Sequence, residues 1–252
     1  MIGLLFAGAL GVIAAQNALK KVRSGLDPPA YTVEPDYRVS LCITAYQEER
    51  YIGRLLASAH NQTYPFHDMV VGDSSNDHTG EIARYWGARV VPVPAGNISM
   101  GRNAAANGAH GDILIFADAD VMFHCQFVER AVAALARGAA LVHPREVIYD
   151  SAFWNAWLYL PQVTRPWWNT TRCVAVWRNV WEEVGGYDPA CNPTTDRCRE
   201  DLDFGSRVAE AYGRGSIRTL PFLIGTSARR YKAQGLRGWE RFDEPARARR
   251  GS

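Results

Sequence analysis

The chain has 252 residues, of which 47% are hydrophobic and 21% are charged, with a net charge of +2. These values exclude a disordered or fibrous chain and allow a substantial core, in one domain or in two closely packed halves. Residues 226–252 hold eight Lys or Arg and three acidic residues, a local charge of +5. Such a tail suits lipid headgroups or a phosphate-bearing ligand better than duplex nucleic acid, and a solvated tail is the simpler alternative.

The N-terminus begins with an apolar run. Residues 1–15 read MIGLLFAGALGVIAA, and Lys20, Lys21 and Arg23 follow. A spanning helix needs ~20 apolar residues, so a thin span, an interfacial helix and a signal peptide all stay open. No basic residue precedes the run, which disfavours a cleaved signal, and the positive-inside rule places the basic end in the cytoplasm. We expect residues 1–23 to form a membrane-associated helix on a cytoplasmic body; packing of this helix on its own domain is the alternative.

A linker precedes an alternation of strands and helices. Residues 24–37 contain three prolines and no apolar period, so the folded body begins near Arg38. Strand-like runs then alternate with helical segments, which predicts an α/β fold with a mainly parallel sheet and helices on both faces. The predicted strands are 39–44, 69–72, 89–93, 112–117 and 139–148, and the predicted helices are 49–61, 79–86, 102–110 and 125–137.

The five cysteines are widely scattered and show no C-x-x-C spacing. This pattern predicts reduced thiols and argues against a zinc site. A small disulfide loop is the alternative for the last two if they face an oxidising compartment. The residues are Cys42, Cys125, Cys173, Cys191 and Cys198.

Two aspartates stand directly after a buried strand. The apolar run that begins at Ile113 ends in Asp118-Ala-Asp120. Ligands of such sheets bind at the carboxyl ends of the strands, and Mg²⁺ and Mn²⁺ prefer oxygen ligands. Asp-x-Asp alone often marks an ordinary turn, but its place after a strand favours a metal site shared with diphosphate oxygens.

Two further loops carry polar side chains at the same edge of the sheet. Tyr46 and Glu48 follow the first strand, and Asp73 follows the second. Asp73 is placed to accept a hydrogen bond from the base or ribose of a nucleotide. Asp77 or Thr79 is expected to cap the helix that follows.

Together these segments resemble glycosyltransferase family 2, an inverting family with the GT-A fold. Five motifs match in order over about 80 residues. Gln47 stands where the family usually has Asn, and Gly72 stands where the nucleotide loop has its first Asp. The matching segments are Ala45-Tyr46-Gln47-Glu48-Glu49, Gln62-Thr63-Tyr64-Pro65, Val71 to Thr79, Gly101-Arg102-Asn103 and Asp118-Ala119-Asp120.

The resemblance implies a Rossmann-like nucleotide-sugar-binding half at 38–121, an acceptor-binding and catalytic half at 122–225, and a basic tail at 226–252. It implies Mn²⁺ or Mg²⁺ as the cofactor, held by Asp120 and Asp118. No His lies near Arg229, where the family often supplies a third metal ligand. The implied donor-binding residues are Ala45, Tyr46, Glu48 and Asp73 for the nucleoside, Arg102 and Asp118 for the ribose or phosphates, and Arg229 and Arg230 for the diphosphate.

The second half carries a candidate for the catalytic base. In the family, a Glu-Asp pair at the start of a helix supplies this base, and the chain has Glu200-Asp201. A carboxylate suits the role because the acceptor hydroxyl must lose its proton as it attacks the anomeric carbon. A helix N-terminus favours the ionised form. We expect Asp201 to be the base and Glu200 to orient the acceptor; the alternative is that both merely enrich the first turn of a helix.

Six of the eight tryptophans lie between residues 154 and 181. Such rings pack in cores, stack on sugars or lie at membrane interfaces. We expect Trp177 and Trp181 to pack in the core. Trp167 and Trp168, which follow Pro166, are expected to border the acceptor.

The predicted function is inverting, metal-dependent transfer of a sugar from a UDP- or GDP-linked donor to the hydroxyl of a glycan or a lipid-linked acceptor. A polyprenyl-phosphate sugar transferase is one alternative, since its anionic acceptor needs no base such as Asp201. A degenerate donor-binding protein would be expected to lack the carboxylates present here. A sugar nucleotidyltransferase would need a Gly-rich phosphate loop after the first strand. No nucleic-acid partner is expected.

Overall fold

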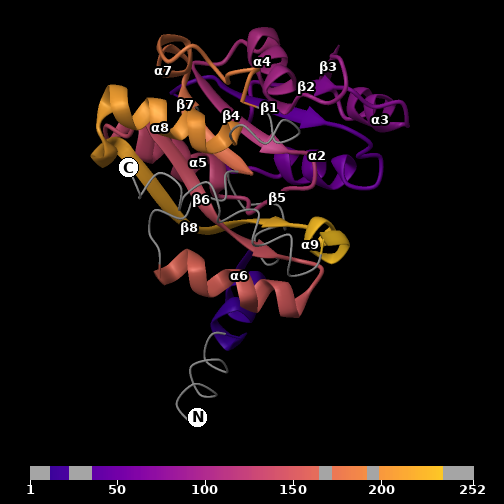
Figure 1. Cartoon of the computed structure of the whole chain (residues 1–252), viewed down its shortest axis with the longest axis vertical. Coiled ribbons are helices and arrows are strands. Elements are labelled where there is room, and N and C mark those ends of the chain that lie inside the picture. Colours follow the sequence, from indigo (N-terminus) through magenta and orange to yellow (C-terminus); the bar gives the residue numbers. More distant parts are fainter. Residues whose placement is uncertain (1–11, 23–35, 165–171, 192–198, 235–252) are drawn as a thin grey trace.

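The centre of the molecule is an eight-stranded sheet with the strand order β3-β2-β1-β4-β7-β6-β8-β5 (Figure 1). The computed structural model describes residues 12–22, 36–164, 172–191 and 199–234. The strands are β1 (Val39–Ala45), β2 (Asp68–Asp73), β3 (Arg89–Pro92), β4 (Ile113–Asp118), β5 (Met122–Phe123), β6 (Leu141–Ile148), β7 (Cys173–Trp177) and β8 (Ile217–Thr226).

Parallel and antiparallel pairs both occur in this sheet. Strands β3, β2, β1 and β4 run parallel to one another, and β6 runs parallel to β8. Strand β7 is antiparallel to both of its neighbours, β4 and β6, and β5 is antiparallel to β8. The predicted mainly parallel α/β sheet is confirmed. Strand β7 lies between β4 and β6 and so joins the strands of the first half of the chain to those of the second half.

Helices cover both faces of the sheet, as predicted. Successive side chains of a strand point to opposite faces. Ile113 and Ile115 of β4 pack in a core with α2 and α5, whereas Leu114 and Phe116 pack in a second core with α4 and α8. The helices are α2 (Ile52–His60), α3 (Thr79–Tyr85), α4 (Ile98–Gly108), α5 (Phe127–Ala136), α6 (Ala152–Thr164), α7 (Arg178–Glu183), α8 (Glu200–Tyr212) and α9 (Arg229–Gln234).

Two glycines let α4 approach the ends of β1 and β2. A side chain on Gly72 would place its Cβ 2.2 Å from the carbonyl oxygen of Gly101, and one on Gly101 would place its Cβ 2.4 Å from Thr44 Oγ1. Both distances lie well inside van der Waals contact, so only glycine fits at either position. Gly72, which stands where the resembling family has an aspartate, suits this close approach of α4.

The described part of the apolar N-terminus, residues 12–22, is helical and lies beside α6 at one end of the molecule (Figure 1). Leu19 and Val22 pack in a small core with Tyr149 and its neighbours. Asn155 of α6 donates a hydrogen bond to the carbonyl of Ala15 at 2.8 Å. None of the helices in the described ranges has the length and apolar character that a membrane span requires.

The cysteines depart in part from the prediction of reduced thiols. Cys42, Cys125 and Cys173 are free, as expected. Cys191 is disulfide-bonded, so the prediction is wrong for this residue and the disulfide alternative holds there. Cys198, the partner that the sequence suggests, lies outside the described residues.

Candidate active site

The ends of three neighbouring strands bring the predicted donor-binding residues together. Ala45 at the end of β1 is in register with Asp73 at the end of β2, and Thr44 is in register with Asp118 at the end of β4. Tyr46 follows β1 directly, and 59% of it is exposed. These residues therefore lie along one edge of the sheet, at the carboxyl ends of parallel strands.

Hydrogen bonds join the loop after β1 to the loop after β2. The amide and hydroxyl of Ser74 donate to the carbonyl of Ala45 at 3.0 and 3.1 Å. The amide of Gln47 donates to Ser75 Oγ, and that of Glu48 donates to Thr79 Oγ1. One main-chain bond and three bonds through side-chain hydroxyls thus hold the two segments together next to the exposed Tyr46 ring.

Arg102 of α4 connects the end of β4 with the start of α8. Its Nη2 atom lies 3.1 Å from Asp118 Oδ1 and 3.5 Å from Glu200 Oε1, and its guanidinium lies over the ring of Tyr187. Only 4% of Arg102 is exposed. Burial raises the pKa of Glu200, while the charge of Arg102 opposes this rise. The guanidinium of Arg102 therefore contacts both a predicted donor-binding residue, Asp118, and a predicted catalytic residue, Glu200.

Asp120 lies in a second charge cluster, together with Arg229 of α9. Arg229 Nε lies 3.3 Å from Asp120 Oδ2, and the same guanidinium binds the carboxylate of Glu48. Thr226 Oγ1 donates to Asp120 Oδ1 at 3.2 Å. Burial raises the pKa of Glu48, and the hydrogen bond from Arg229 counteracts it. One arginine therefore lies between two of the predicted ligand-binding carboxylates.

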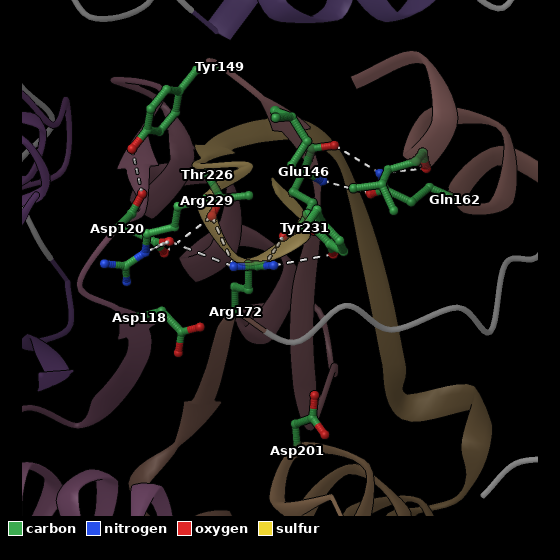
Figure 2. Close-up of polar contacts among 12 residues, drawn as sticks. Asp118, Asp120, Glu146, Tyr149, Gln162, Arg172, Asp201, Thr226, Arg229 and Tyr231 are labelled. Carbon is green, nitrogen blue, oxygen red and sulfur yellow. Dashed lines mark hydrogen bonds and ion pairs between the residues drawn. The ribbon is translucent and has the colours of Figure 1, made fainter. Parts of the chain in front are cut away.

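Arg172, directly before β7, lies at the centre of this second cluster (Figure 2). Its guanidinium is 3.8 Å from Asp120 Oδ2 and 3.4 Å from the carboxylate of Glu146. It also donates to Thr226 Oγ1 and to the hydroxyl of Tyr231, each at 3.3 Å. The sequence analysis did not single out Arg172, because an isolated arginine ahead of an antiparallel strand carries no motif.

Asp201 lies in the first turn of α8, on the other side of Asp118 from Asp120 in the view of Figure 2. Its Oδ2 atom accepts a hydrogen bond from Arg199 at 2.9 Å, and its Oδ1 atom accepts one from the amide of Leu202. Only 8% of Asp201 is exposed. The start of α8 thus holds this carboxylate in an ionic contact at the helix N-terminus.

Comparison with known proteins identifies the family. The family model described as glycosyl transferase family 2 matches residues 40–194, which is more than half of the chain. The chain belongs to glycosyl transferase family 2. Over 128 residues it is 35% identical to the 4,4'-diaponeurosporenoate glycosyltransferase of Staphylococcus haemolyticus, a match that covers 46% of this chain and 34% of that protein. The chain spans about a third of the length of the curated relatives that it matches.

Solved structures show the same fold as this member of glycosyl transferase family 2. It is similar to the mannosyltransferase of Pyrobaculum calidifontis in complex with GDP-mannose and Mn²⁺, with a TM-score of 0.64, 21% identity and coverage of 98% of this chain and 76% of that one. It is also similar to glucosyl-3-phosphoglycerate synthase of Mycobacterium tuberculosis, with a TM-score of 0.61, 20% identity and coverage of 83% and 81%. The predicted GT-A fold is confirmed.

Three predicted site residues of this family 2 member lie wholly or in their side chains outside the described residues. Trp167 and Trp168 lie outside the described residues, and so does the side chain of Arg230. Trp177 and Trp181 follow the prediction, because Trp181 is buried and Trp177 packs against the core.

The charge clusters also show how the chain fits a divalent cation. In the ranges that the structure describes, no three His, Cys, Asp or Glu side chains converge to form a complete site. Asp118 and Asp120 supply two carboxylates, and Glu48 Oε2 nearby is a buried oxygen without a hydrogen-bond partner in the described part of the chain. Mg²⁺ commonly uses one or two carboxylates together with substrate phosphates. The residues therefore fit a cation that binds with a diphosphate, and not one held by protein alone.

Proposed function

We propose that this chain is an inverting glycosyltransferase that moves a sugar from a nucleoside diphosphate donor to a hydroxyl group. Two buried polar atoms at the strand ends carry the proposal. Within the described part of the molecule, Arg102 Nη1 and Glu48 Oε2 have no hydrogen-bond partner. Buried polar atoms are nearly always paired, with protein groups, water or a ligand, so a bound ligand can supply the partner of each of these two atoms. The Arg102 atom is a positively charged hydrogen-bond donor and the Glu48 atom is a carboxylate oxygen, and the two residues contact Asp118 and the Asp120 cluster respectively. This pair of groups suits a nucleotide diphosphate with its cation.

The donor's nucleoside is proposed to lie over the loops after β1 and β2. The exposed ring of Tyr46 offers a surface on which a base can stack, and Asp73 offers a carboxylate to base or ribose. The similar mannosyltransferase was solved with GDP-mannose, and the similar synthase was also solved with UDP and Mn²⁺. These complexes support a UDP- or GDP-linked donor for this chain, with Mn²⁺ or Mg²⁺ as cofactor.

The proposed reaction is a single displacement at the anomeric carbon. The acceptor oxygen forms the new bond as its proton passes to Asp201, and the bond to the diphosphate breaks with its electron pair on the leaving oxygen. Glu200 orients the acceptor. Arg229, at the start of α9, and Arg230 are proposed to stabilise the charge that grows on the diphosphate. A bound cation held by Asp118 and Asp120 would supply further charge neutralisation.

The acceptor and the location of the enzyme are also proposals. The apolar residues 1–15, followed by Lys20 and Lys21, support attachment to a membrane with the body on the cytoplasmic side. The disulfide of Cys191 argues for an oxidising compartment instead. Labelling of accessible cysteines in intact and in permeabilised cells decides between the two sides. A membrane location favours a lipid-linked acceptor.

A thermal-shift screen tests the donor proposal. UDP, GDP, CMP and their sugar conjugates are added with and without Mn²⁺, since a ligand that binds only the folded state raises its stability. We expect a Mn²⁺-dependent rise with one nucleotide, and its loss in Asp120→Asn. Asp112→Asn, which changes a surface ion pair with Arg38, is the matched control. The absence of any shift in well-folded protein would indicate a degenerate site and overturn the proposal.

A further inference from the structure

Helix α6 carries apolar side chains both toward the body and toward solvent, although it lies at the surface (Figure 1). Its thirteen residues include no Asp, Glu, Lys or Arg. Trp154 and Leu158 face the body and are buried. Phe153 and Trp157 point away from it, are 60% and 45% exposed, and stack at 6.2 Å. The outer face of a surface helix is normally polar, so the exposed aromatic rings on the outer face of this charge-free helix require an explanation.

The N-terminal helix lies beside α6 and also exposes apolar side chains. Val12 and Ile13 are 44% and 58% exposed, and the same helix is bonded to α6 through Ala15 and Asn155. The other large exposed hydrophobic residues of the described chain are scattered singly over separate elements, where they need no explanation. They are Tyr46, Tyr85, Met100 and Tyr212.

The sequence at the two ends of the N-terminal helix indicates what covers this apolar face. Eleven residues, MIGLLFAGALG, precede Val12 and carry no charge, while Lys20 and Lys21 are exposed at the opposite end of the helix. An apolar end followed by basic residues is the arrangement of a segment that enters a bilayer and keeps its basic end at the headgroups. Tryptophan is enriched at the same depth, where its ring is partly apolar and partly wet.

We propose that α6 and the N-terminal helix form one membrane-docking face, which inserts its aromatic side chains into the headgroup region of a lipid bilayer. The N-terminal segment alone would tether the body but leave its orientation free. A second contact through Phe153 and Trp157 fixes which side of the body faces the lipid.

The docking face is connected with the candidate active site through one buried stack. Trp154, next to Phe153, stacks on Tyr231 with ring centroids 5.2 Å apart. The hydroxyl of Tyr231 accepts a hydrogen bond from Arg172, which in turn lies beside Asp120. Docking of α6 therefore brings the α9 side of the site close to the bilayer. Given the proposed transferase function, on which this step depends, the acceptor is a lipid-linked molecule that reaches the site from the membrane.

Vesicle partitioning of the full chain tests the docking face. Phosphatidylcholine vesicles with phosphatidylglycerol are titrated into wild type, Phe153→Ser/Trp157→Ser, and the control Tyr85→Ser, whose ring is exposed on α3. Because each aromatic side chain removed from water contributes roughly a factor of ten, we expect partitioning of the double variant to fall at least about tenfold and that of the control to stay unchanged. Equal partitioning of all three would count against the proposal.

A second measurement is independent of how strongly residues 1–11 bind. Brominated lipids quench only tryptophans that lie in the bilayer, so Trp157→Phe should reduce the quenched emission, whereas Trp86→Phe at the end of α3 should not. If both variants retain the full quenched emission, α6 is not in the lipid and the proposal is wrong. It is also wrong if wild type self-associates without vesicles and the double variant does not, since a second copy would then cover the face. The nucleotide-dependent thermal shift is measured on the double variant as well. If the shift persists there, donor binding does not depend on the docking face, and the two proposals are tested independently.

Discussion

The guanidinium of Arg229 lies 3.3 Å from the carboxylate of Asp120, the residue predicted to bind the metal. The same group binds Glu48 and lies 4.5 Å from the ring of Tyr51. A positive side chain thus neutralises two carboxylates in the position where a divalent cation and a diphosphate are expected. We propose that Arg229 has two roles in turn, as a counter-ion before the ligands bind and as a partner of the diphosphate afterwards.

Replacement of Arg229 by glutamine tests this exchange. Without the Arg229 guanidinium, Glu48 loses its counter-ion and Asp120 keeps the more distant Arg172 at 3.8 Å, so Mn²⁺ should bind about tenfold more tightly in the absence of nucleotide. Binding of the nucleotide diphosphate in the presence of Mn²⁺ should weaken, because its phosphate loses a partner. Calorimetric titration measures both affinities, with Arg38→Gln as the surface control. Unchanged or weaker Mn²⁺ binding by the variant would show that Arg229 does not compete with the cation.

The buried pair of Arg172 and Glu146 gives a prediction about stability. Glu146 is 1% exposed, and Arg172 Nε lies 3.4 Å from its carboxylate. Arg172→Met leaves this buried charge without its guanidinium, which should lower the free energy of unfolding by about 3–5 kcal/mol. Glu146→Met/Arg172→Met should recover a large part of the loss, since the two charges are removed together. Urea denaturation measures the free energy of unfolding of the wild type, both single variants and the double variant. A double variant that loses more free energy of unfolding than the two single variants together would contradict the prediction.

The parallel part of the fold followed from local patterns. Runs such as 39–44 and 112–117 are apolar and of strand length, and they correspond to β1 and β4 with no end shifted by more than one residue. Helix α4 begins four residues earlier than predicted because the Asn97 side chain caps it, accepting a hydrogen bond from the amide of Met100. The pairing of β7 with β4 and β6 depends on contacts between distant segments, and no local period contains that information.

The same distinction applies to the site. Asp73, Asp118 and Asp120 follow strands whose carboxyl ends meet at one edge, so their proximity could be predicted from the sequence. Arg172 comes 54 residues after Asp118 and arrives only through the antiparallel pairing of β7. Cys191 was expected to be reduced because spacing alone does not reveal whether two cysteines meet.

His143 of β6 predicts how stability changes with pH. It is 2% exposed, and burial, with the charge of Arg145 adding to it, lowers its pKa from 6.5 to about 4. Below pH 6.5 the unfolded chain takes up a proton at this residue and the folded chain does not. Stability is therefore lost as the pH falls from 6.5 to about 4, by up to about 3 kcal/mol.

His143→Gln removes this loss. Its thermal midpoint should fall less steeply than that of wild type over this pH range, while His60→Gln, at an exposed histidine, should follow the wild-type curve. Parallel curves for wild type and His143→Gln would show that His143 is not held neutral in the folded state.

Asp201 and Glu200 share the first turn of α8 but are proposed to differ in role. Asp201→Asn keeps the size of the side chain and its contact with Arg199, so the nucleotide-dependent thermal shift should persist while turnover falls by roughly 10²–10⁴. Glu200→Gln leaves the base in place and should mainly raise KM for the acceptor, because Glu200 is proposed to orient it. Steady-state kinetics with saturating donor separate the two effects. Normal turnover by Asp201→Asn would remove the proposed base and favour an acceptor that is already an anion, such as a polyprenyl phosphate, for which no proton has to be taken up.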